Sequence, residues 1–164
     1  MIPTPQKFKD TQGKEWVIEI NAGTFRHVKR EIGVDLADCL ALENNLIDRM
    51  GLDLCLLIDL IQTICQSQWE AQGLNGEEFV SRLNGEAIDT AGDGIIQALI
   101  DFFPPSRSGP LRKVATVRKR VKERATAKAD QLLESLTDEK IDQAVDTILN
   151  GSGALSSNSP DSSG

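Results

Sequence analysis

Residues 53–72 read DLCLLIDLIQTICQSQWEAQ, and we expect the fold to be organised around this stretch. Apolar side chains would cover nearly every side of a helix through these 20 residues, which indicates a helix buried on several sides. Such a helix would be about 30 Å long. Asp59, Gln62 and Gln66 interrupt the apolar run well before the ~18 consecutive apolar residues that a membrane span requires. The stretch therefore predicts a central core helix, ended by Gly73 in the left-handed conformation that glycine adopts readily.

The N-terminal part of the chain has the alternating pattern of a β-hairpin. Residues 7–9 and 15–20 are two candidate strands, and the glycine-containing turn between them has a length typical of hairpin loops. Trp16, Ile18 and Ile20 alternate with other residues, as in a strand with one buried face. A lone hairpin is only marginally stable in water, so we expect this one to pack on helices or to pair with another chain.

The apolar residues beyond the hairpin recur at helical spacing and predict further helices. Asn21 and Asn75 are placed as helix caps, the second with a glutamate three residues on. Gly92 and Gly94 would each cost about 1 kcal/mol in a helix relative to alanine. They therefore predict a bend or loose turn near Asp93.

The last third of the chain has its own pattern. Proline, glycine and serine residues at 104–110 mark a boundary, and residues 111–136 beyond it predict a long, basic helix. Residues 138–149 predict a shorter amphipathic helix, and residues 151–164 have the composition of a disordered tail. The long helix has a narrow apolar seam of the coiled-coil kind, formed by Val114, Val117, Val121, Ala125, Ala129, Leu132 and Leu136.

Together these patterns predict a mainly α fold of the α+β class. An N-terminal β-hairpin packs on a helical bundle, and a long basic helix and a short C-terminal helix follow. We divide the chain into a hairpin-plus-helical domain at residues 1–105, the two helices at 106–150 and a tail at 151–164.

Formal charge is unevenly distributed along the chain. Residues 107–128 hold nine basic residues and one acid, which gives about +8, whereas the remaining residues carry about −15 of the total of −7. Basic residues on a helix can neutralise nucleic-acid phosphates, but this segment has no aromatic residue for stacking on bases. We therefore expect a solvated basic face, or one that docks on acidic residues, and not a nucleic-acid site.

The sequence has no recognisable catalytic arrangement. His27 is the only histidine and lacks the second histidine or cysteine that a metal site needs. Cys55 and Cys65 would lie about 15 Å apart along one helix and so could not form a disulfide with each other. We expect all three cysteines to be free, buried thiols. These observations predict a protein that is not an enzyme and that has neither a metal nor a cofactor.

Five segments between residues 7 and 105 carry a resemblance to a known family. They are WVIEIN at 16–21, TFRHVKREIGVDL at 24–36, GLNGEEF at 73–79, LNGEAI at 83–88 and DFFP at 101–104. With these segments the chain resembles the small tail assembly chaperones of long-tailed bacteriophages and prophages. The resemblance implies a non-enzymatic helical protein of the bacterial host cytoplasm. Such a protein binds the tape measure protein during tail morphogenesis and is absent from the mature virion.

A tape measure chain is long, helical and apolar, so an apolar groove for amphipathic helices would suit it as a partner. Self-association of the chaperone is a second expectation, and we expect no membrane partner. The side chains that we expect to contact the tape measure protein are Phe79, Leu83, Ile88, Ile95, Leu99, Phe102 and Phe103.

Two alternatives stay open at this point. A structural or adaptor protein of the phage tail could have the same helical architecture, but it would be found in purified virions. A nucleic-acid-binding module would use the basic helix at residues 111–128, and its affinity would fall steeply as salt rises.

Overall fold

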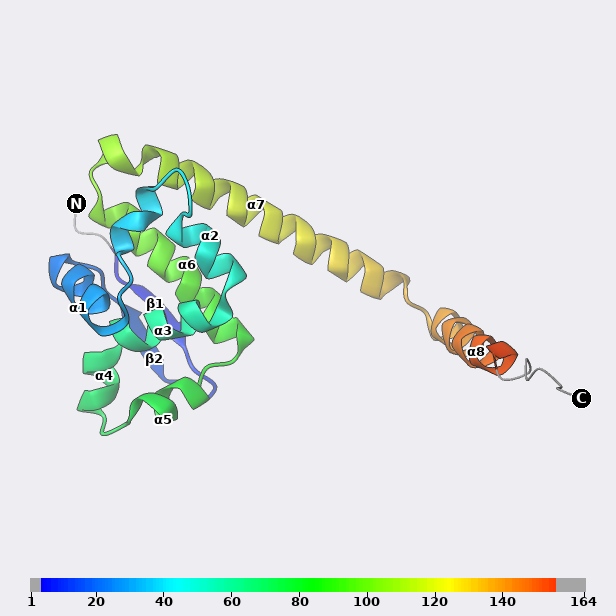
Figure 1. Cartoon of the computed structure of the whole chain (residues 1–164). Coiled ribbons are helices and arrows are strands. Elements are labelled where there is room, and N and C mark those ends of the chain that lie inside the picture. Colours follow the sequence, from blue (N-terminus) through cyan, green and yellow to red (C-terminus); the bar gives the residue numbers. More distant parts are fainter. Residues whose placement is uncertain (1–3, 156–164) are drawn as a thin grey trace, which may run out of the picture. The chain divides into compact units, whose positions relative to one another are not determined.

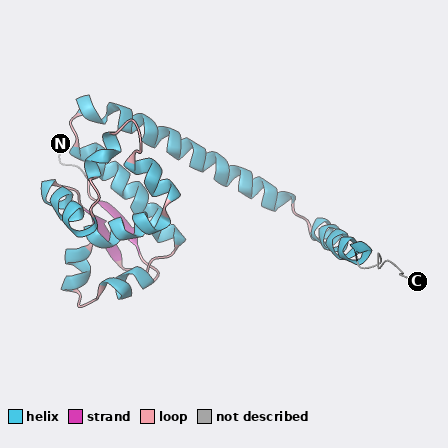
Figure 2. Cartoon of the chain, viewed as in Figure 1, coloured by secondary structure: helices cyan, strands magenta, loops and turns pink. Residues whose placement is uncertain are grey.

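The computed structural model describes residues 4–155, which form two strands, eight α-helices and one 3-10 helix (Figures 1 and 2). The predicted fold class, mainly α with an N-terminal β-hairpin, is confirmed. The elements are β1 (Gln6–Lys9), β2 (Glu15–Ile18), α1 (Ala22–Ile32), η1 (Leu36–Leu40), α2 (Leu46–Leu52), α3 (Leu54–Ile64), α4 (Gln66–Ala71), α5 (Gly76–Ser81), α6 (Gly85–Phe102), α7 (Pro105–Ser135) and α8 (Asp138–Leu155).

The chain divides into two compact units, Met1–Val117 and Arg118–Gly164. Helix α7 therefore belongs to both units, whereas our sequence-based boundary lay after residue 105. The first unit contains the hydrophobic core, to which the hairpin, α3 and α6 contribute most of the largest fully buried side chains. None of the helices within residues 4–155 is long and apolar enough to cross a membrane.

The β-hairpin is antiparallel, with Phe8 opposite Trp16 and Lys7 opposite Val17. Phe8 and Trp16 point into the core and are buried. The buried carboxylate of Asp10 holds the turn, because one of its oxygens accepts the backbone N–H groups of Gln12 and Lys14, both at 2.9 Å. Its other oxygen accepts the indole N–H of Trp16 at 3.0 Å. This one side chain therefore fixes both the turn and the tryptophan ring.

Helix α6 packs on the hairpin and runs without interruption through both of its internal glycines. The loose turn that the sequence analysis allowed near Asp93 is therefore absent. A Cβ atom at Gly94 would lie 3.2 Å from the Cβ atom of Gln6 and 3.5 Å from Ile18, and one at Gly92 would lie 3.3 Å from Leu57. Glycine is needed at both positions because β1, β2 and α3 approach the helix backbone closely.

The predicted central helix from Asp53 to Gln72 is instead two helices, α3 and α4, separated at Cys65. In a continuous helix, the carbonyl of Gln62 would accept the N–H of Gln66. Here that carbonyl accepts the indole N–H of Trp69 at 2.9 Å. The carbonyl of Cys65 accepts the N–H groups of Gln68 and Trp69 and so begins the hydrogen-bond pattern of α4. Helix α3 has the buried apolar character that the sequence predicts.

The predicted helix caps are present. Asn21 and Asn75 each accept a backbone N–H three residues on, and Glu78 returns a bond to the N–H of Asn75 at 2.8 Å. Gly33 and Gly73 have positive φ angles of 70° and 73° just after their helices, where a residue with a Cβ atom would be strained.

Helix α7 begins at Pro105, six residues before the predicted start at Leu111. Pro105 suits the first helical position because its missing N–H would have no partner there. The N–H groups of Arg107 and Ser108 are accepted by the Pro104 carbonyl at 2.8 and 3.0 Å. Ser108 and Leu111 are buried, so the first turns of α7 pack on the first unit.

Helix α8 begins where the sequence predicts, with the Thr137 hydroxyl accepting the N–H of Lys140 at 3.4 Å. It continues to Leu155, six residues beyond the predicted end at Leu149. The expected disorder is therefore wrong for residues 151–155, and the rest of the predicted tail lies outside the described residues.

Candidate partner-binding site

No three histidine, cysteine or acidic side chains within residues 4–155 lie close enough to hold a metal ion. The ring nitrogens of His27 lie 2.9 Å from the Gln66 side chain and 3.0 Å from Arg30, so structural partners occupy both.

The cysteines are free, but they differ in exposure. Burial raises the pKa of Cys39 to about 11 and that of Cys65 to about 12. Both thiols therefore stay protonated near neutral pH, unlike the lowered-pKa thiols of catalytic cysteines. Cys55 is exposed, which contradicts the expectation that all three are buried, because it lies on the side of α3 that faces away from the core.

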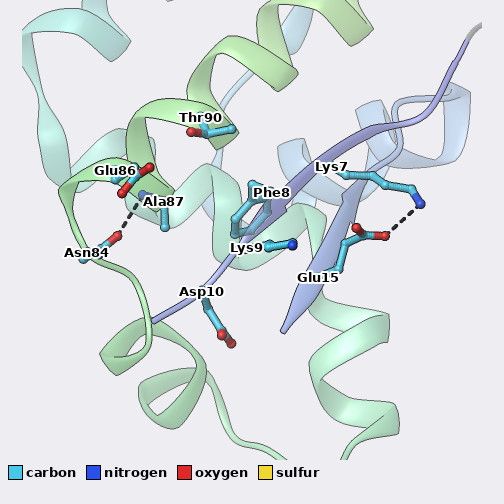
Figure 3. Close-up of a pocket in the computed structure, with 9 residues that line it drawn as sticks. All are labelled: Lys7, Phe8, Lys9, Asp10, Glu15, Asn84, Glu86, Ala87 and Thr90. Atoms are coloured by element: carbon cyan, nitrogen blue, oxygen red, sulfur yellow. Dashed lines mark hydrogen bonds and ion pairs between the residues drawn. The ribbon is translucent and has the colours of Figure 1, made fainter. Parts of the chain in front are cut away.

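A groove of about 350 Å³ runs between β1 and the first turns of α6 (Figure 3). Its strand side includes Lys7 and Lys9, and Lys7 makes an ion pair of 2.7 Å with Glu15 on β2. Its helix side includes Asn84, which caps α6, and Glu86. Lysines on a short edge strand discourage pairing with other chains. We therefore interpret this groove as a protected sheet edge and not as a binding site.

A larger cavity, of about 580 Å³, lies at the opposite end of the hairpin. It is formed where the start of β1 and the end of β2 meet the last turns of α6. We call it the Phe102 cavity. The apolar residues that line it are Pro5, Val17, Ile18, Ile20, Ala98 and Phe102, and the polar ones include Glu19, Asn21 and Asp101. An apolar cavity with a few polar groups is the usual form of a binding site.

Phe102, which lines this cavity, packs against Phe25 and Phe103, and we call these three rings the aromatic rim. The ring centre of Phe102 lies 4.5 Å from that of Phe25 and 5.1 Å from that of Phe103, and Phe25 and Phe103 are 5.9 Å apart. Phe102 is 40% exposed, and the other two rings are half-buried. Exposed aromatic residues beside an apolar cavity are typical of the anchor points of protein interfaces.

The structure separates the seven sequence-predicted contact residues into two groups. Phe79, Ile88, Ile95 and Leu99 are buried in the core, because their helix faces pack on the hairpin and on α3, and so they are not available to a partner in this fold. Leu83 is half-buried against the same core. Phe102 and Phe103 remain at the surface, and both belong to the aromatic rim.

The sequence analysis did not single out Phe25, Ile20 or Ala98 as contact residues. Phe25 lies on α1, and it meets Phe102 only because α1 and the end of α6 come together. No local pattern could have shown a cluster whose members are 77 positions apart.

The second unit offers a different apolar surface. Val121, Leu132 and Leu133 on α7 and Ile141 and Val145 on α8 are all exposed. Every side chain from residue 123 to residue 151 is exposed as well, so these residues form no core of their own. Comparison of the chain with protein-family models, with curated proteins and with solved structures finds no match in any of the three.

Proposed function

We propose that this protein is a tail assembly chaperone that binds apolar helical segments of a tape measure protein and keeps that protein soluble until the tail tube encloses it. The observation that carries the proposal is the Phe102 cavity with its aromatic rim. A cavity of this size can accept apolar side chains from one face of an amphipathic helix. The resemblance of residues 7–105 to such chaperones supports the same assignment.

The charge of the chain also suits a chaperone. The net charge of −7 would help to keep a complex with an apolar partner in solution. Glu19 and Asp101 at the cavity place negative charge beside the apolar contact, where it can discourage aggregation of the complex.

The proposal is tested by co-expressing the chain with the tape measure protein of the same phage and measuring how much of the latter is soluble and co-purifies. Phe102→Ser should reduce both amounts, because it removes the exposed ring from the cavity rim. Leu42→Ser is the matched control, since Leu42 is fully exposed and does not line the cavity. A tape measure protein that stays equally soluble with Phe102→Ser, or that needs Leu42 as much, would contradict the proposed site.

Salt separates this proposal from nucleic-acid binding. An apolar contact should persist at ~0.5 M salt, where exposed charge pairs are mostly screened. Binding to nucleic acid should instead weaken steeply, because phosphate contacts release counterions. Replacing Arg118, Lys119, Arg120 and Lys122 with Gln should leave tape-measure solubilisation largely intact. Loss of solubilisation in that variant, with its fold unchanged, would assign the binding surface to α7.

The adaptor alternative is tested on assembled particles. A chaperone leaves the tail before assembly is complete, so purified virions should lack the chain. Its detection there by mass spectrometry, at a copy number comparable with other tail proteins, would favour a structural role.

A further inference from the structure

The second unit contains two amphipathic helical segments whose apolar sides are uncovered in the single chain. Residues 118–135 of α7 present Val121, Leu132 and Leu133, and α8 presents Ile141 and Val145. Most helical stability in proteins comes from tertiary packing of an apolar face and not from intrinsic helix propensity. A stable second unit therefore needs a surface that covers these side chains.

The charges beside these apolar residues are complementary. Residues 118–124 of α7 contain five basic side chains and one acidic one, for a net charge of about +4. Residues 138–149 of α8 contain four acidic side chains and one basic one, for about −3. Charged residues that flank an apolar seam decide which helix packs on which. The charges therefore favour packing of α8 on residues 118–124.

The connection between the helices prevents this packing within one chain. Only two residues, Leu136 and Thr137, separate α7 from α8, and a link this short allows only an antiparallel hairpin if the two helices pack together. In an antiparallel hairpin, the residues that directly precede the turn lie beside those that directly follow it. The acidic residues 138–146 would therefore lie beside residues 127–135. Residues 127–135 contain one basic and two acidic side chains, so like charges would meet.

We propose that two copies of this chain associate reciprocally, with α8 of each copy packed on the basic half of α7, residues 118–132, in the other. A second copy is not bound by the two-residue link, so its acidic helix can lie beside residues 118–124. Such a dimer is two-fold symmetric and uses the same surface twice. It covers the exposed apolar side chains of α7 and α8 at both sites. The inference goes beyond the proposed function and does not depend on the identity of the partner that the first unit binds.

The test is to measure the mass of the full-length protein by light scattering during gel filtration, over a series of protein concentrations. The wild-type chain should form dimers. Replacing Arg118, Arg120 and Arg124 with Glu changes the net charge of residues 118–124 from about +4 to about −2, and this variant alone should be monomeric. Asp138→Lys with Asp142→Lys makes α8 basic, and it too should be monomeric alone. An equal mixture of the two variants should form dimers again, because opposite charges then meet at both contacts.

Two controls make the result specific. Glu43→Lys with Asp59→Lys changes the net charge as much as the α8 variant does, but at exposed positions of the first unit, and it should remain dimeric. Val121→Asp should give monomers by placing a carboxylate in the apolar contact. A monomeric wild-type chain at every concentration overturns the proposal. Dimers of either charge-reversed variant alone, or a mixture that stays monomeric, overturn it equally. The experiment contains no tape measure protein, so its outcome is independent of the proposed chaperone function.

Discussion

The side chain of Gln68 hydrogen-bonds to both backbone polar groups of Val17. Its carbonyl oxygen accepts the Val17 N–H at 3.0 Å, and its amide nitrogen donates to the Val17 carbonyl at 2.8 Å. Both groups of Val17 point away from β1, so Gln68 takes the place of a third strand at the free edge of β2. This relationship gives a reason for the break at Cys65, since the separate helix α4 carries the residue that closes the sheet edge.

We expect Gln68→Leu to lower the free energy of unfolding by about 1–3 kcal/mol. The substitution leaves the partly buried N–H of Val17 without its partner and leaves the Val17 carbonyl with only the weak Cys65 thiol donor at 3.8 Å, and unsatisfied buried groups cost this much. Urea denaturation followed by tryptophan fluorescence measures the change. Gln97→Leu is the control, because Gln97 makes only an exposed bond to Asp101, and it should change stability by less than about 0.5 kcal/mol. Equal effects of the two substitutions would show that the Val17 contact is not important.

The glycines of the helices should respond differently to alanine. Gly51 in α2 has no heavy atom within 4 Å of the position of a Cβ atom, so Gly51→Ala should stabilise the fold by about 0.4–1 kcal/mol. Gly94→Ala should give no such gain, because its methyl group would press against Gln6 and Ile18. Gly94→Val should destabilise by about 1–3 kcal/mol. Thermal unfolding of the three variants ranks them, and a stabilised Gly94→Val would disprove the close packing of α6 on the hairpin.

The three thiols should react with iodoacetamide at very different rates. Only the thiolate reacts, and the pKa values of about 11 for Cys39 and about 12 for Cys65 leave fewer than roughly one thiol in 10³ ionised at pH 8. Both are also buried, whereas Cys55 is exposed. Mass spectrometry of the native protein should therefore find one modified cysteine, Cys55, and three after denaturation. Modification of Cys65 as fast as Cys55 would place Cys65 at the surface.

Local signals in the sequence predicted the local structure well. The caps at Asn21 and Asn75 and the left-handed glycines depend on residues a few positions apart, so their pattern is visible in the chain. The break at Cys65 and the continuity of α6 through Gly94 depend on tertiary contacts, with the Trp69 side chain in one case and the hairpin in the other. Periodicity alone cannot show which side of a helix meets such a neighbour.

The candidate site was harder to predict, for a related reason. Helical spacing identified the apolar face of α6, but it could not show that Ile95 and Leu99 fill the core while Phe102, on the same helix, reaches the surface. The Phe102 cavity is lined by residues between positions 4 and 21 and between positions 98 and 102, which are far apart in sequence. Its aromatic rim also includes Phe25 from α1. The exposed residues of α7 were recognised as a seam, but the sequence alone did not indicate what would cover them.

The last prediction concerns where the stable core ends. The buried residues extend to Leu111, and every side chain from residue 123 to residue 151 is exposed. A fragment of residues 1–117 should therefore unfold at the same urea concentration as the full chain. A fragment of residues 1–105, which ends at the boundary that the sequence suggested, should be less stable. It lacks the buried Ser108 and Leu111, and burial of one leucine contributes about 1.5–3 kcal/mol.

Tryptophan fluorescence suits this comparison, because both tryptophans, Trp16 and Trp69, lie in the first unit and are buried. Leu111→Ala in the 1–117 fragment is the matched control. It should reproduce most of the loss seen in the shorter fragment, because it empties the same place in the core while keeping the first turns of α7. If instead the 1–105 and 1–117 fragments unfold together, the start of α7 contributes nothing to the core. If the 1–117 fragment is markedly less stable than the full chain, the second unit stabilises the first through contacts beyond Val117.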